Sequence, residues 1–171
     1  MDCKGAPLCG VLVLETGLGS GNYHHDAVAV HGLWPETGSY GSSQCIKPSS
    51  SRMDPSKVYS CYEQDGQSKD DLISFETHEW EKHGSCAGVE DAEDFFSQVC
   101  GLAREPLQQM AQTKSSGTTD LDEYAKDLRG AGYPVFATDS GNSQVELSCC
   151  AGSDGQWVLA NTSDFGSKCG A

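Results

Sequence analysis

The chain has 171 residues, a formal net charge of −14 at pH 7 and a sequence pI of about 4.5. This length is enough to bury one hydrophobic core, so we expect a single domain over residues 1–171. An acidic chain lacks the broad basic footprint on which nucleic-acid binding normally rests. No apolar run is long enough to cross a membrane, and composition therefore argues against a membrane protein.

Nine cysteines are many for a chain of this length and indicate an oxidising compartment with several disulfide bonds. The odd number leaves at least one cysteine without a partner in the chain. The opening MDCKGAPLCG lacks the basic start and apolar middle of a signal peptide. We therefore interpret the sequence as a mature secreted form with an added Met1. Asn161-Thr162-Ser163 is a glycosylation acceptor triplet, which fits secretion.

Three segments have the composition of β-strands. CGVLVLETG (9–17) and HDAVAVHGLWP (25–35) are β-rich and end at Gly or Pro. Both faces of the second are largely apolar, which predicts a central strand covered on both sides, with His31 at its end. Near the C-terminus, SQVELSCC and QWVLAN flank AGSDG and predict a hairpin.

Helix signals separate these strands. The predicted helices are a short one opening at Asp54-Pro55 toward Cys61, residues 70–83 ended by Gly84, the core-facing segment 89–103, and a helix from Asp120 to Gly130 with Glu123 as its capping partner. We expect the aromatic residues of these helices, and Trp80 and Trp157, to lie in the core. The pattern predicts an α+β fold in which helices pack on a mostly antiparallel sheet.

The segment HEWEKHGSC (78–86) invites comparison with a zinc site. A zinc protease places two histidines four residues apart on one helix face. His78 and His83 are five apart and diverge by about 140° around a helix, so we predict neither a metal nor another cofactor. Glu79 does share a face with Lys82 and His83. An imidazole beside a cation suits a reaction in which an anionic phosphorane or oxyanion develops. The alternative is a polar helix end whose histidine interacts with the helix dipole.

A second histidine segment, HGLWPE (31–36), supports the chemical interpretation. It places His31 beside Trp34 and Pro35. Two separated histidines are what a phosphodiester transfer needs, because one neutral imidazole accepts a proton from the attacking hydroxyl while a charged one donates a proton to the leaving oxygen.

HGLWPE together with HEWEKHGSC resembles the two active-site segments of the ribonuclease T2 family, which are secreted and vacuolar acid endoribonucleases. Their order and separation agree with the family. The match is best between residues 25 and 100, and QVELSCCAG near the C-terminus resembles the family's late strand. The resemblance implies a disulfide-stabilised, ribonuclease T2-like fold.

The resemblance also implies roles for the two segments. His31 matches the general acid toward the 5′-oxygen, and His83 matches the general base on the 2′-hydroxyl. Glu79 and Lys82 match the residues that orient and stabilise the pentacovalent phosphate. His78 matches an auxiliary phosphate-binding histidine.

Three further residues match positions that contact the base. Trp34 lies where the family either stacks a base or supports the first histidine. Glu36 lies where an acid reads a base, and Tyr40 is a candidate for stacking in the following loop.

The implied activity is cleavage of single-stranded RNA through a 2′,3′-cyclic phosphate, followed by hydrolysis to a 3′-phosphate. No metal is required because the 2′-hydroxyl is an internal nucleophile, and DNA lacks that group. We expect a monomer that is secreted or resides in a vacuole or lysosome, with no membrane contact. Activity should peak between about pH 4 and 6, where one imidazole is charged and another neutral. Phosphate binding through a few local groups would tolerate the acidic surface.

For the cysteines, the resemblance favours Cys45 with Cys86. Cys3 with Cys9, and Cys149 or Cys150 with Cys169, are further candidates, and the connectivity stays open.

The sequence departs from the family at Phe75-Glu76, where Phe-Trp is usual, and at Ser85, where Thr is usual. His24 and His25 match no family motif and are expected on the surface. Two other classes of function are alternatives. One is a T2-like protein that acts by binding, as an effector, toxin or storage protein. The other is a zinc protein, which the histidine spacing disfavours.

Overall fold

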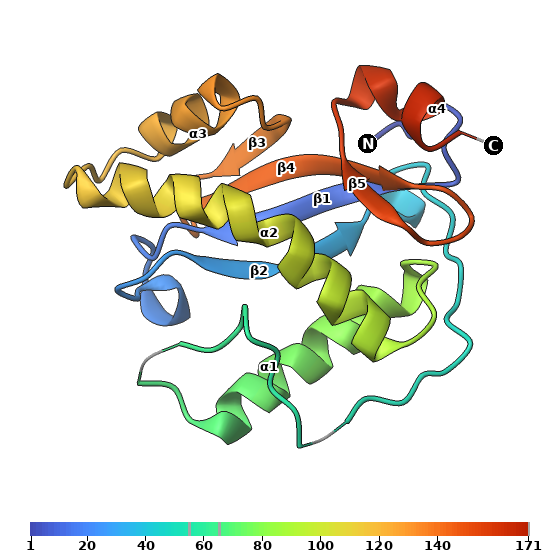
Figure 1. Ribbon diagram of the computed structural model, residues 1–171, viewed down its shortest axis with the longest axis horizontal. Coiled ribbons are helices and arrows are strands. Elements are labelled where there is room, and N and C mark those ends of the chain that lie inside the picture. Colours follow the sequence, from blue (N-terminus) through green and yellow to red (C-terminus); the bar gives the residue numbers. More distant parts are fainter. Residues whose placement is uncertain (55, 65, 171) are drawn as a thin grey trace.

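The computed structural model describes residues 1–54, 56–64 and 66–170. Its centre is an antiparallel sheet whose strands follow the order β2 (Ala29–Pro35), β1 (Leu8–Glu15), β4 (Gln144–Ala151) and β3 (Val135–Asp139) (Figure 1). A short strand, β5 (Trp157–Leu159), pairs with the other end of β4 and completes the predicted hairpin. All residues of β1 are buried, and a neighbouring strand lies on each side of it.

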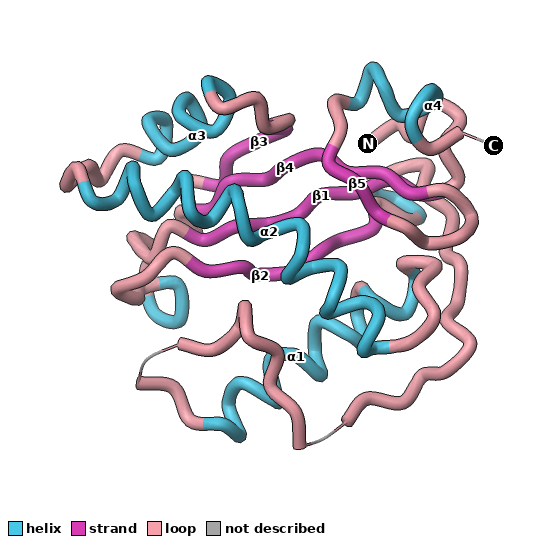
Figure 2. The backbone as a smooth tube through the Cα atoms, viewed as in Figure 1, coloured by secondary structure: helices cyan, strands magenta, loops and turns pink. Residues whose placement is uncertain are grey.

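Helices surround this sheet. They are α1 (Lys69–Lys82), α2 (Ala92–Ser115), α3 (Leu121–Gly130) and α4 (Phe165–Lys168). In Figure 2, α2 crosses one face of the sheet and α1 lies beyond its β2 edge. The α+β prediction with an antiparallel sheet is confirmed. Within the described residues, no helix combines the length and apolar character that crossing a membrane requires.

The helix ends follow from local capping. Ser68 begins α1, because its hydroxyl accepts a hydrogen bond from the backbone N–H of Asp71. Asp120 begins α3 by accepting from Asp122, so the predicted start of that helix is confirmed. The core-facing helix is longer than predicted: α2 continues through the buried Pro106 to Ser115.

The predicted short helix toward Cys61 is wrong in its described part. Residues 56–61 form turns and irregular segments. The Asp54 carboxylate accepts hydrogen bonds from both the backbone N–H and the hydroxyl of Ser56, which makes an Asx turn instead of a helix cap. Pro55, on which the helix prediction also rested, lies outside the described residues.

The core lies between the sheet and α2 and α3. Phe95 and Phe96 of α2 and Tyr124 of α3 are fully buried there. Trp80 and Trp157 are core residues as predicted, at 3% and 5% exposure. Each indole N–H finds a backbone carbonyl, so these large rings are buried without an unpaired donor.

Strand β2 differs from the prediction in two ways. It is an edge strand of the sheet, not a central one, although six of its seven residues are buried. Glu79 of α1 contacts His31 and Trp34, so α1 packs against this strand. His31 also lies within the strand and not at its end, at the position where the β1–β2 register shifts.

Eight cysteines form four disulfide bonds: Cys3–Cys9, Cys45–Cys86, Cys61–Cys100 and Cys150–Cys169. The ninth, Cys149, is buried and unpaired. Cys61–Cys100 was not anticipated from the sequence. It ties the long loop before α1 to the middle of the core helix α2.

We predict that replacing both Cys61 and Cys100 by alanine lowers the free energy of unfolding by about 2–4 kcal/mol, because the unfolded chain regains the freedom of the closed loop. Urea denaturation under oxidising conditions measures this loss. The slope of the unfolding free energy against urea concentration should be compared between the variant and the wild type. An unchanged unfolding midpoint would contradict a stabilising role for this bond.

Candidate active site

His31 is held in a buried setting by contacts at both ring nitrogens. The strand pairing runs Val13 with Gly32 and Leu14 with Val30, which leaves His31 as the extra residue of a β-bulge. Bulges re-aim side chains and are common beside active sites. The Nδ1 atom of His31 lies 2.6 Å from a carboxylate oxygen of Glu15, and Nε2 lies 3.4 Å from a carboxylate oxygen of Glu79.

Glu79 joins α1 to β2. It is 1% exposed, and its second carboxylate oxygen accepts a 3.0 Å hydrogen bond from the indole N–H of Trp34. A Cβ atom on Gly32 would lie 2.1 Å from that same oxygen. Glycine at position 32 is therefore what lets the carboxylate approach the strand so closely.

His83 reaches the same place from the C-terminal end of α1. Its ring stacks on Trp34 with centroids 5.1 Å apart and planes 19° from parallel. The edge contact between His31 and Trp34 has the same centroid distance. One indole thus contacts both imidazoles, which the sequence alone could not establish.

The pKa values of the two imidazoles are shifted in opposite directions. Burial lowers the pKa of His31, but its hydrogen bonds and ion pairs with Glu15 and Glu79 outweigh burial and raise that pKa to about 9. Burial lowers the pKa of His83 to about 4; the charge of Glu79 opposes this shift, and that of Lys82 adds to it. At mildly acid to neutral pH, His31 is therefore charged while His83 is neutral.

Lys82 and His78 are exposed near the same end of α1. Both are close enough for their charges to lower the pKa of His83. The predicted row of Glu79, Lys82 and His83 thus has a buried carboxylate, a half-buried imidazole and an exposed ammonium group. Among the described residues, no group of three or more His, Cys, Asp or Glu side chains could hold a metal ion.

Comparison with known proteins agrees with these segments. The model of the ribonuclease T2 family matches residues 9–125. The chain belongs to this family. It is also 38% identical over 81 residues to Ribonuclease 3 of Arabidopsis thaliana, a match that covers 39% of this chain. The chain spans about a third of the length of that curated relative, since 33% of it is covered.

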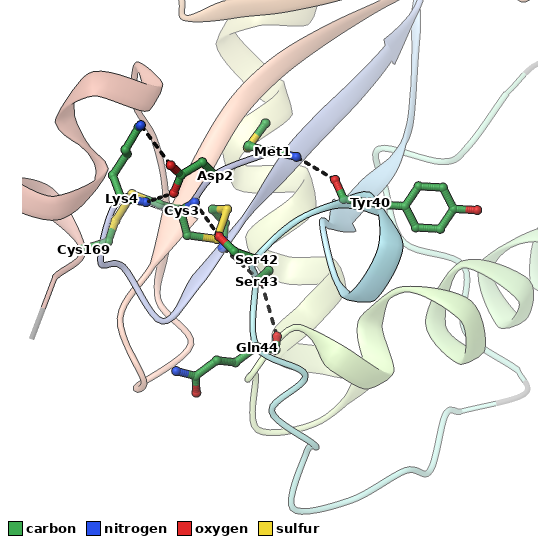
Figure 3. Close-up of a disulfide and its surroundings, with 11 residues drawn as sticks. Met1, Asp2, Cys3, Lys4, Tyr40, Ser42, Ser43, Gln44 and Cys169 are labelled. Carbon is green, nitrogen blue, oxygen red and sulfur yellow. Dashed lines mark hydrogen bonds and ion pairs between the residues drawn. A yellow bond between two sulfur atoms is a disulfide. The ribbon is translucent and has the colours of Figure 1, made fainter.

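The loop that carries the T2-family base-contacting candidates is anchored by the N-terminal segment. The ammonium group of Met1 donates to the carbonyl oxygen of Tyr40, and the backbone N–H of Cys3 donates to the hydroxyl of Ser42 (Figure 3). The ring of Tyr40 is 76% exposed. Glu36 is half-buried, and burial raises its pKa. Within the described residues, neither side chain contacts His31 or His83 through a hydrogen bond or ring stacking.

The departure from the T2-family pattern at Phe75-Glu76 affects packing. The Phe75 ring contacts the edge of His31 with centroids 5.1 Å apart, so it forms one wall around that imidazole. Glu76 is fully buried and accepts a 2.8 Å hydrogen bond from the backbone N–H of Tyr59. Burial raises the pKa of Glu76 to about 7.

Sequence reasoning missed three residues around His31. Glu15 and Gln144 lie beside its Nδ1 atom, and both are buried. His25 was expected on the surface, but its Nε2 lies 2.8 Å from Glu15, and its side chain is only 12% exposed. His24 is exposed as expected. The one available signal was that Glu15 is the sole charged residue of an otherwise apolar strand.

We predict that the imidazoles of His31 and His83 titrate far apart, near pH 9 and pH 4 respectively. Two carboxylates stabilise the charged form of His31, whereas burial disfavours the charged form of His83. NMR titration of ¹⁵N-labelled histidines measures both values, with assignments from His31→Asn and His83→Asn variants. Two titrations that both fall near pH 6.5, the usual value for histidine, would contradict this electrostatic description.

Proposed function

We propose that the chain is a metal-independent endoribonuclease that cleaves single-stranded RNA by transphosphorylation to a 2′,3′-cyclic phosphate and then hydrolyses that product to a 3′-phosphate. We further propose that residues 1–171 form one domain that acts as a monomer. Membership of the ribonuclease T2 family and the similarity to a protein named Ribonuclease 3 support the ribonuclease assignment.

The observation that carries the proposal is that two imidazoles pack on one indole and differ in charge, one protonated and one neutral. His31 has a pKa raised to about 9 and His83 has a pKa lowered to about 4. Both rings contact Trp34. A charged and a neutral imidazole at one place are a general acid and a general base that coexist over a wide pH range.

In the proposed first step, His83 accepts the proton of the ribose 2′-hydroxyl, and the 2′-oxygen attacks the adjacent phosphorus. The bond to the 5′-oxygen breaks as His31 donates its Nε2 proton to that oxygen. The 3.4 Å separation between Nε2 and Glu79 is longer than a strong charge-assisted hydrogen bond, which leaves this proton available for transfer. In the second step water replaces the 5′-hydroxyl and the two imidazoles exchange roles.

Charge on the phosphorane is balanced by cations close to it. Lys82 and His78 are exposed beside His83 and are the groups proposed to contact the phosphate oxygens. Glu79 is buried, so its proposed role is to hold Trp34 and orient His31. The internal 2′-hydroxyl supplies the nucleophile, which is why the proposal needs no metal and excludes DNA as a substrate.

Base contacts are proposed for the loop after β2. The exposed Tyr40 ring can stack on an unpaired base, and Glu36 lies four residues before it. Trp34 already packs against His31 and His83, so its proposed role is to support the two imidazoles. Four disulfides favour an extracellular, vacuolar or lysosomal location. The exposed Asn161 is the proposed glycosylation site.

We predict that the protein degrades single-stranded RNA at mildly acid pH in EDTA, and that His31→Ala and His83→Phe each lower the rate by about 100- to 10,000-fold, since each variant loses a proton-transfer group. Product analysis should show 2′,3′-cyclic phosphates early and 3′-phosphates later.

The matched substrate is DNA of the same base sequence, and the matched variant is His24→Ala, which replaces an exposed histidine outside the site. DNA should stay intact and His24→Ala should keep full activity. Equal RNA degradation by the wild type and both active-site variants would defeat the enzymatic assignment and leave a binding role as the alternative.

We predict a bell-shaped dependence of kcat/KM on pH for RNA cleavage. The rate should rise as His83 loses its proton through about pH 4 and fall as His31 loses its proton through about pH 9. These two values place the maximum at about pH 6.5, midway between 4 and 9, which lies above the range of about pH 4 to 6 expected from the sequence. Initial rates on a dinucleotide substrate give both limbs, and a rate still increasing above the alkaline limb would rule out His31 as the acid.

A further inference from the structure

A carboxylate that the proposed mechanism does not use lies behind His31. Glu15 ends β1, and one of its oxygens lies 2.6 Å from His31 Nδ1 while the other lies 2.8 Å from His25 Nε2. Glu15 is 6% exposed. A carboxylate buried to this extent would be strongly destabilising without partners, and here each oxygen has an imidazole.

The strand register places these groups together. Glu15 pairs with Ala29 on one side and with Gln144 on the other. His31 is two residues beyond Ala29 and is therefore the diagonal neighbour of Glu15. The Gln144 amide donates a 3.2 Å hydrogen bond to Oε1 of Glu15, the oxygen that also faces His31. When Nδ1 of His31 carries its proton, its 2.9 Å approach to Gln144 Nε2 is not a hydrogen bond, because both atoms are then donors.

His25 is fixed in its loop by interactions on both sides. Its Nδ1 lies 2.6 Å from the carbonyl oxygen of Ala27. The ammonium group of Lys114, in the last turn of α2, donates to the carbonyl oxygens of His25 and Thr16. Lys114 therefore ties the loop after β1 to the helix and sets where the His25 ring meets Glu15.

We propose that Glu15 and His25 are positioning residues for the general acid: Glu15 holds the Nδ1–H of His31 so that Nε2 faces the reacting phosphate, and His25 balances the charge on the second oxygen of Glu15. This inference rests on the proposed function. A buried carboxylate that orients a histidine is a known device in acid–base catalysis. The second histidine is the additional feature here, because it moderates how strongly Glu15 retains the proton of His31.

The charges around Glu15 and His31 determine in which direction each change shifts the pKa of His31. Hydrogen bonds from His25 and His31 hold the pKa of Glu15 below its usual value in spite of burial. The hydrogen bond to Glu15 raises the pKa of His25. Among the described residues, the other polar or charged groups around this cluster include Tyr23 from the loop, Glu79 from α1, His83 at the end of α1, Lys114 from α2, Asp139 from β3 and Gln144 from β4. Removing Glu15 or His25 should therefore shift His31 in opposite directions.

The experiment compares Glu15→Gln, His25→Asn and the control His24→Asn, an exposed neighbour in the same loop, in the full chain. Glu15→Gln keeps an acceptor for Nδ1–H but removes the charge, so the His31 titration and the alkaline limb of kcat/KM should fall by about one to three pH units. His25→Asn should move both upward, and His24→Asn should move neither. Because Glu15 does not touch substrate, kcat should fall with little change in KM.

The two readouts separate this inference from the proposed function. NMR titration of His31 needs no RNA, whereas an inactive wild-type chain would count against the ribonuclease proposal alone. Circular dichroism checks folding; if Glu15→Gln does not fold, the half-buried His25→Asn still decides. An active His25→Asn variant whose His31 titration and alkaline limb equal those of the wild type overturns the inference, and so does a folded Glu15→Gln variant with an unshifted His31.

Discussion

The site depends on one imidazole held between two buried carboxylates. His31 meets Glu15 of β1 through Nδ1 and Glu79 of α1 through Nε2. Both carboxylates are at most 6% exposed, and burying them is tolerable only because each is paired. Moving α1 away from the sheet would break the contacts of Glu79 with both His31 and Trp34. The charge pairing therefore holds the helix that carries His83 against the strand that carries His31, and Gly32 permits the contact.

Local charge also reconciles the acidic chain with an anionic substrate. The net charge of −14 is spread over the whole chain, and exposed charges farther apart than about 8–10 Å are largely screened at physiological salt. In the candidate site, the charged forms of His31 and His78 and the exposed Lys82 are cationic, while Glu15 and Glu79 are buried and paired. The paired carboxylates thus raise the pKa of His31, the proposed acid, without presenting their charge to the proposed RNA substrate.

The parts of the site that were predictable are those encoded locally. Glu79 and His83 share a helix face because they are four residues apart, and the two motifs brought His31 to the same chemistry. Glu15 and Gln144 were missed because their meeting with His31 depends on strand register, across 16 residues of chain for Glu15 and 113 for Gln144. The β-bulge at His31 and the edge position of β2 depend on pairing in the same way. Apolar residues on both faces of β2 predicted its burial correctly, but they did not show that the strand lies at the edge of the sheet.

The proposed catalytic and base-contacting residues are held by different kinds of contact. The Cys45–Cys86 disulfide and the bridge between Ile46 and Ala87 tie the loop after β2 to the residues that follow α1. They constrain the distance between the two histidine segments. Tyr40 is held by its backbone, while its ring projects into solvent. Changes in that ring should therefore alter the proposed base contact without disturbing the imidazoles, because no ring contact or hydrogen bond among the described residues couples the Tyr40 side chain to His31 or His83.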